Sequence, residues 1–352
     1  MGIGSVREPP LRAVDLFAGC GGLSLGLRRA GFRVEVAVEV DHRRAKTFLR
    51  NHPQTALLVA DIRVLRGEDI IRAMRDPSDV VDLVAGCPPC EGFSRIRRRN
   101  KLQAVRDERN SLVLHFGRLV RDLSPRAFMM ENVPGLQFDA RFFKLLRVLR
   151  GAGYRIDWGI LNLADYGLPQ RRNRVVVIGW RGDLRPDLSQ IPRGPRRTVR
   201  DAIARLPRIP EPVRVLHEYS PRYSQAVEDR IRRIPRDGGS RTRLPRELTL
   251  ACHARNDGFR DVYGRMSWDS VAPTITGGYI NPSKGRFLHP SRNRALTVLE
   301  GARIQGFPIW YRFDPADGRY PIAEMVGEAL PPIFARRAAA YIRKHLEAVT
   351  KK

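Results

Sequence analysis

Cysteine is scarce in this chain of 352 residues, which contains only four. So few cysteines exclude the disulfide framework of a small secreted scaffold. Cys87 and Cys90 have the spacing of a C-x-x-C motif, but no second ligand pair stands where a zinc site would need one. A thioredoxin-like redox motif also follows a strand, so redox chemistry stays open as an alternative at this point. We expect no bound metal.

Long apolar segments are absent as well. No run approaches the roughly 20 apolar residues that a membrane-spanning helix needs. Residues 1–10 lack the apolar core of a signal peptide. We therefore expect a protein of the cytoplasm, or one associated with the bacterial nucleoid, that has no membrane partner.

Acidic residues are few, with 37 Asp and Glu against 64 Lys and Arg and a net charge of +27. Lysine stands at only seven positions, so nearly all of the positive charge is carried by arginine. GC-biased coding accounts for part of that arginine content but leaves the imbalance unexplained. The surplus predicts a polyanionic partner, most simply nucleic acid.

Strand and helix patterns alternate through the first half of the chain. Repeated units of this kind predict an α/β fold with a doubly wound, Rossmann-like sheet. The length allows a second, smaller domain beside it. We expect strands near 14–17, 34–39, 57–59, 80–85 and 127–130, closing strands over 155–161 and 175–179, and helices over 23–30, 41–50, 112–123, 142–149, 297–304 and 334–346.

A glycine-rich turn, residues 17–22, follows the first expected strand. It allows a ligand to approach the backbone closely and leads into a helix N-terminus, although the three-glycine dinucleotide spacing is missing. Glu39 is placed to accept from ribose hydroxyls, and Asp61 from an adenine amino group. Each carboxylate alone is as easily a solvated strand end. Acids at successive strand ends together favour an adenosyl cofactor.

Cys90 lies within residues 86–94, directly after an apolar strand. Open α/β sheets present their chemistry at the carboxyl ends of strands, and a thiolate held there by prolines can act as a nucleophile. The neighbouring Cys87 is expected to be a packing residue. From the residues alone, Cys90 remains compatible with nucleophilic, redox or packing roles.

Six segments then occur in one order, and through them the chain resembles the cytosine-C5 DNA methyltransferases over nearly its whole length. The resemblance implies transfer of a methyl group from S-adenosylmethionine to C5 of a cytosine that has been flipped out of duplex DNA. The segments are residues 15–22, 86–94, 131–135, 170–174, 294–308 and 326–332.

The resemblance assigns four catalytic residues. Cys90 is implied as the nucleophile that adds to C6 of the cytosine, and Glu131 as the group that holds the N3 and amino edge. Arg172 and Arg174 are implied to hold O2 and the developing charge, although a generic phosphate contact competes for both arginines. The implied cofactor-binding residues are Asp15, Phe17, Gly19, Gly21, Glu39, Asp61, Ile62, Pro89 and Gly327.

The same resemblance implies three parts of the chain. Residues 11–180 form the catalytic and cofactor-binding domain, 181–290 a DNA target-recognition domain, and 291–350 a return segment that completes the catalytic domain. Because residues 181–290 are rich in Arg, Pro and Gly, a disordered linker is the alternative to a folded domain there. We expect a monomer acting on double-stranded DNA as the modifying enzyme of a restriction-modification system.

Three positions depart from the family pattern. Glu91 stands where glutamine is common, Leu299 where arginine is common, and Glu328 where asparagine is common. Leu299 puts an ion pair of Glu300 in doubt, and Glu328 puts hydrogen bonding near the cofactor in doubt. An RNA (tRNA) cytosine-C5 methyltransferase and a catalytically silent DNA-binding relative remain alternatives. The sequence indicates neither the DNA target nor a partner endonuclease.

Overall fold

The structure, a computed structural model, describes residues 9–77, 80–89, 108–183, 185–206, 214, 216, 222–251 and 260–350. The chain forms two compact units. Unit 1 combines residues 1–161, 173–192 and 335–352, and unit 2 combines residues 162–172 and 193–334. Cys90 and Glu91 lie outside the described residues.

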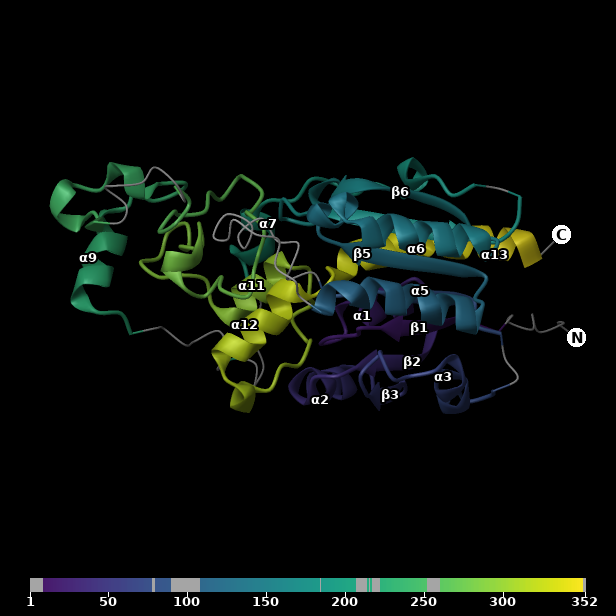
Figure 1. The fold of residues 1–352 in the computed structure, drawn as a ribbon. Coiled ribbons are helices and arrows are strands. Elements are labelled where there is room, and N and C mark those ends of the chain that lie inside the picture. The colour runs from purple at the N-terminus through teal and green to yellow at the C-terminus, as the bar shows by residue number, and fades with distance from the viewer. Residues whose placement is uncertain are drawn as a thin grey trace, which may run out of the picture. The chain divides into compact units, whose positions relative to one another are not determined.

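Unit 1 is built on a seven-stranded sheet of order β3-β2-β1-β4-β5-β7-β6 (Figure 1). Strands β1 to β5 pair in parallel, and β7 runs antiparallel to β5. This is the predicted doubly wound Rossmann-like sheet, with an antiparallel strand near one edge. The strands are β1 (Arg12–Leu16), β2 (Arg33–Glu39), β3 (Ala56–Val59), β4 (Leu83–Gly86), β5 (Ala127–Asn132), β6 (Arg155–Asn162) and β7 (Asn173–Trp180).

Strand β4 begins at Leu83, three residues later than the apolar run predicts. The carboxylate of Asp82 accepts from the backbone N–H of Arg12 at 2.7 Å and from the guanidinium of Arg126 at 2.9 Å. Val80 is 61% exposed. The apolar run is therefore longer than the assigned strand, although backbone hydrogen bonds to Arg12 and Ala127 continue at Asp82.

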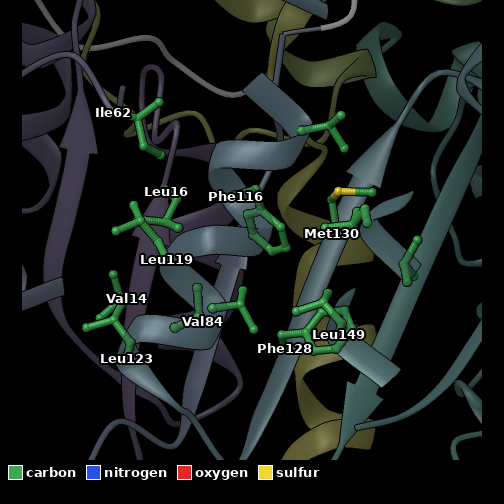
Figure 2. Packing of buried hydrophobic residues seen from close by; sticks show 14 of the residues in the cluster. Val14, Leu16, Ile62, Val84, Phe116, Leu119, Leu123, Phe128, Met130 and Leu149 are labelled. Atoms are coloured by element: carbon green, nitrogen blue, oxygen red, sulfur yellow. The ribbon is translucent and has the colours of Figure 1, made fainter. Parts of the chain in front are cut away.

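One face of the sheet is covered by α3 (Gly67–Ala73), α5 (Leu112–Leu123) and α6 (Ala140–Gly151). Figure 2 shows Phe116 and Leu119 of α5 packed over Leu16 and Val84 of the sheet. Burying this continuous apolar layer is the main stabilising contribution to unit 1.

The opposite face carries α1 (Gly22–Arg29), α2 (His42–Asn51) and α13 (Pro332–Thr350). Successive strand residues face opposite sides, so Ala37 packs on Phe48 of α2 while Val36 joins the other layer. Gly26 of α1 meets α13 closely, because a Cβ there would lie 2.3 Å from the Cβ of Ala335. Glycine at this position permits the approach of the two helices.

Unit 2 is largely irregular in the part that the structure describes. Its longer helices are α9 (Gln225–Arg233), α11 (Val298–Ile304) and α12 (Arg319–Glu328), with a short α7 (Val199–Ile203). A small core joins α9 to the surrounding loops through four buried residues, Ile231, Ile234, Tyr263 and Leu288. No helix in the described ranges is long and apolar enough to cross a membrane.

Candidate active site

The turn after β1 brings strained backbone to the carboxyl end of the sheet. Phe17, Gly19 and Gly21 have φ values of 64°, 55° and 94°, in the left-handed region. For Phe17 this conformation is costly, and such strain concentrates at binding sites. A Cβ at Gly19 would meet nothing within 4 Å, so the turn borders open space. Gly21 caps α1 without a side-chain hydrogen bond.

Asp15 lies fully buried at the base of this turn. Its Oδ2 accepts from the hydroxyl of Ser24 at 2.6 Å, whereas Oδ1 has no hydrogen-bond partner among the described residues. Burial raises the pKa of Asp15 to about 7 against the opposing effect of the Ser24 hydrogen bond. Glu39 nearby raises it further.

Glu39 is the last residue of β2, and both oxygens of its carboxylate accept hydrogen bonds from backbone N–H groups. Its Oε2 accepts from the N–H of Gly19 at 2.7 Å, and its Oε1 from the N–H of Asp41 at 2.8 Å. The carboxylate is therefore held in one orientation beside the glycine turn. Each oxygen keeps a lone pair that could accept from a diol.

Asp61 and Ile62 follow β3. Ile62 is buried, whereas the Asp61 carboxylate forms a fork with Arg63, at 2.8 Å to Nε and 2.6 Å to Nη2. The hydrogen bonds from Arg63 lower the pKa of Asp61. The carboxylate is ionised and largely satisfied within the chain, a partner for Asp61 that the sequence reasoning did not foresee.

The loop after β4 is tied to the end of β5 by Asn132. Its Nδ2 donates to the carbonyl of Pro88 at 3.1 Å, and its Oδ1 accepts from the N–H of Val133 at 2.8 Å. Asn132 is 2% exposed. In the sequence, Asn132 stands out only as a member of the segment 131–135. The structure gives it a role in setting where the chain leaves Pro89 toward Cys90.

Glu131 and Arg174 form a buried ion pair across neighbouring strands. The Arg174 Nε lies 2.7 Å from the Glu131 Oε1, and the side chains are 12% and 7% exposed. The antiparallel register of β5 and β7, which pairs Glu131 with Val176, brings the two side chains together. Two of the four predicted catalytic residues are therefore in contact.

Arg172 and Gly327 belong to unit 2. The guanidinium of Arg172 is buried and donates to the carbonyls of Ile275 at 3.0 Å and Gly327 at 3.1 Å. A Cβ at Gly327 would lie 2.4 Å from the backbone of Thr276, so the close packing requires glycine. Arg172 thus fixes two segments of unit 2 to each other.

The structure shows the surroundings of two positions that depart from the family pattern, Leu299 and Glu328. Glu300 is paired by Arg294 at 2.7 and 2.8 Å, so an arginine outside α11 supplies the partner that Leu299 cannot. Those contacts outweigh desolvation and lower the pKa of Glu300. Glu328 is the exposed last residue of α12. Among the described residues, no cluster of three His, Cys, Asp or Glu side chains could hold a metal ion.

The strand ends of unit 1 fit an adenosyl group that carries an amino acid. Glu39 offers an oriented acceptor for hydroxyls beside the open space at Gly19. The uncapped first turn of α1 suits a carboxylate. Ile62, at the neighbouring strand end, is buried in the core of unit 1.

Comparison with known proteins gives one consistent result. The family model for C-5 cytosine-specific DNA methylases matches residues 11–344. The chain is 31% identical to the type II methylase M.HgiDII of Herpetosiphon aurantiacus over 95% of each protein. It is 32% identical to the type II methyltransferase M.XorII of Xanthomonas oryzae pv. oryzae, over 95% of this chain and 84% of that protein.

A solved structure is similar over the same length. It is described as a DNA modification methyltransferase encoded within a prophage, from E. coli. The TM-score is 0.72 with 26% sequence identity, and the match covers 96% of this chain and 99% of that one.

Proposed function

This chain belongs to the C-5 cytosine-specific DNA methylases, and from that premise we propose that Cys90 is its nucleophile. The protein is a DNA (cytosine-5)-methyltransferase that uses S-adenosylmethionine. The observation that carries the assignment of residues is the buried Glu131–Arg174 ion pair at the end of β5. Asn132, next to Glu131, holds the loop that leads to Cys90.

The proposed reaction begins with the thiolate of Cys90. C5 of cytosine is a poor nucleophile, so the Cys90 sulfur adds to C6 and the ring electrons shift toward N3 and C5. C5 then takes the methyl group. Loss of the C5 proton to a base returns its electron pair to the ring and expels the Cys90 thiolate, which restores the aromatic base.

Glu131 and Arg174 support that addition. The Glu131 carboxyl faces the N3 and amino edge of the cytosine, where charge accumulates when the thiolate adds. Arg174 places its positive charge against the Glu131 carboxyl and is proposed to present it to O2 of the cytosine. Arg172 is proposed to contribute to the same site, and its bonds to backbone carbonyls make positioning the way in which it acts.

The cofactor-binding residues of unit 1 are proposed as Asp15, Phe17, Gly19, Gly21, Glu39, Asp61, Ile62 and Pro89. Gly327 is proposed from unit 2. S-adenosylmethionine supplies an electrophilic methyl group when it is bound. Glu39 would hold the ribose hydroxyls, and the first turn of α1 would hold the carboxylate.

The substrate is proposed to be duplex DNA from which the target cytosine is flipped, because C6 is inaccessible inside the stack. Residues 181–290 are proposed as the target-recognition domain, and residues 11–180 and 291–350 as the catalytic domain. Within that last segment, residues 335–350 belong to unit 1, whereas residues 291–334 belong to unit 2. The type II relatives support a role in a restriction-modification system. The enzyme is further proposed to be a monomer of the cytoplasm.

Expression in a bacterial host that lacks cytosine-C5 methylation tests the activity. Bisulfite sequencing of the host DNA is expected to show 5-methylcytosine at one recurring sequence, and the Cys90→Ala variant is expected to show none. Methylation by the Cys90→Ala variant would contradict the assignment of the nucleophile. Transfer to tRNA without transfer to DNA would contradict the substrate.

A further inference from the structure

Arg265 is fully buried in unit 2, yet no carboxylate of the described residues pairs with it. All three nitrogen atoms of its guanidinium donate hydrogen bonds to neutral oxygen atoms. These acceptors are the carbonyls of Ile231 at 2.9 Å, Ile234 at 3.1 Å, His289 at 3.0 Å and Arg292, and the Oδ1 of Asn293 at 2.7 Å. The charge is therefore solvated by the protein but not neutralised.

The acceptors belong to two segments that are distant in sequence. One is the C-terminal end of α9, and the other is the loop of residues 289–293. The N–H of Asp237 also donates to the carbonyl of Pro290 at 3.0 Å, so the chain that follows α9 lies beside this loop. Arg265 thus connects the two segments, because its buried guanidinium donates hydrogen bonds to both.

The loop is held in shape by its own hydrogen bonds. The Nδ1 of His289 accepts from the N–H groups of Ser291 and Arg292, both at 3.1 Å. The indole N–H of Trp268 donates to the hydroxyl of Ser291 at 2.9 Å. Since burial lowers the pKa of His289 to about 4, its ring stays neutral and keeps Nδ1 as an acceptor at neutral pH.

Two exposed arginines project from the joined segments, Arg236 after α9 and Arg292 in the loop. In the described part of unit 2, neither has a carboxylate within ion-pair distance. Arg232 differs from both, because it pairs with Glu228 at 3.0 Å. The carboxylate of Asp237, next to Arg236, already accepts from Ser267 and Trp268.

The guanidinium of Arg236 is close enough to Arg265 to affect its charge state. Burial first, and then the charge of Arg236, lower the pKa of Arg265 to about 10. Like charges held together without counter-charge destabilise the free protein, and an anion that binds there relieves that repulsion. Guanidinium groups suit phosphate in particular, because their donors match two of its oxygens.

We propose that Arg236 and Arg292 bind phosphates of the substrate DNA backbone, and that Arg265 is the positioning residue that fixes their separation. The proposal rests on the proposed function for its ligand, duplex DNA. The further step is to name the side chains of unit 2 that contact the DNA backbone. The two exposed arginines supply affinity that does not depend on the DNA sequence.

The salt dependence of DNA binding tests the proposal. The probe is a short duplex of arbitrary sequence, titrated with the full chain over a series of NaCl concentrations. Each lost phosphate contact reduces the slope of log Kobs against log salt by about 0.9. The double variant Arg236→Gln/Arg292→Gln is expected to lose about 1.8 from the slope, and affinity on the order of tens-fold at ~0.1 M salt.

Arg232→Gln is the matched control, because it removes an exposed arginine of α9 that already has a carboxylate partner. Its slope is expected to equal that of the wild type, as is the affinity of every variant for S-adenosylmethionine. A double variant with the wild-type slope would overturn the proposal. A wild-type protein that does not bind duplex DNA would instead contradict the proposed function.

Arg265→Lys tests the positioning role, since one ammonium group cannot bridge both segments as the guanidinium does. With an unchanged melting temperature, its slope is expected to fall by about 1 or more. If Arg265→Lys does not fold, Asn293→Ala provides the same comparison by removing one acceptor of Arg265. A folded variant that keeps the wild-type slope would show that Arg265 has no positioning role.

Discussion

At the scale of single residues, carboxyl groups at the end of the sheet are set up in different ways. Glu39 is fixed by two backbone N–H donors, Glu131 is paired with an arginine, and the fully buried Asp15 accepts from the hydroxyl and the backbone N–H of Ser24. The burial of Asp15 favours its protonated form, whereas the Arg63 fork favours ionised Asp61. Similar side chains therefore have distinct protonation behaviour within one site.

The raised pKa of Asp15 predicts a pH dependence of stability. The folded protein keeps this proton up to about pH 7, whereas the unfolded chain releases it near the ordinary aspartate pKa of 3.8. The contribution of Asp15 to folding is therefore fully present below about pH 4 and is lost as the pH rises toward about 7, at up to ~1.4 kcal/mol per pH unit.

Asp15→Asn removes that titration. Between about pH 5 and about pH 7, the unfolding free energy of the variant is expected to fall less steeply than that of the wild type. Denaturant titrations at several pH values measure both slopes. Parallel curves for the two proteins would show that Asp15 titrates alike in the folded and unfolded states.

At the scale of elements, α1 and α13 pack so closely that the contact at Gly26 leaves no space for a Cβ atom. Gly26 faces Ala335 so closely that a methyl group would also meet the backbone N of Arg336 at 2.8 Å. Because backbone atoms cannot move aside as a flexible side chain does, Gly26→Ala is expected to destabilise the protein by about 1–3 kcal/mol. Thermal unfolding of the full chain, followed by circular dichroism, measures the change.

Gly151→Ala is the matched control. Gly151 ends α6, and a Cβ there would meet nothing within 4 Å. Alanine is therefore expected to leave the stability unchanged or to raise it by about 0.5–1 kcal/mol. Equal effects of the two substitutions would contradict the close packing of α1 on α13.

The elements also show what sequence can and cannot predict. Helix α5 has the predicted bounds, 112–123, because its apolar residues repeat with helical spacing. The sequence did not predict helix α9, because five of its nine residues are arginine, aspartate or glutamate and few apolar residues mark its buried face. The end of β2 at Glu39 was predicted from its alternating pattern, whereas β1 ends at Leu16, one residue before the predicted end.

The contacts that build the site were less predictable. The Glu131–Arg174 pair depends on the antiparallel register of two strands, which no local pattern records. The partners of Arg172 and Arg265 are mostly backbone carbonyls, and every residue has one. Sequence reasoning therefore found the residue types of the site but not these connections.

At the scale of the whole molecule, arginine has two uses. The net charge of +27 favours association with a polyanion. Arg172, Arg265 and Arg294 are nevertheless buried in unit 2 and bind internal acceptors there. Only exposed arginines without a carboxylate partner are free to hold DNA, so composition alone overstates the binding surface.

The central claim is that Cys90 forms a covalent bond to the target cytosine, and trapping of that adduct tests it most directly. The full chain is incubated with S-adenosylmethionine and a long duplex in which 5-fluorocytosine replaces cytosine. Since the fluorine cannot leave as the C5 proton does, the wild type is expected to yield a denaturant-resistant protein–DNA complex, and Cys90→Ala none. A wild-type protein that binds this DNA without forming the complex, or a complex that persists in Cys90→Ala, would contradict the account.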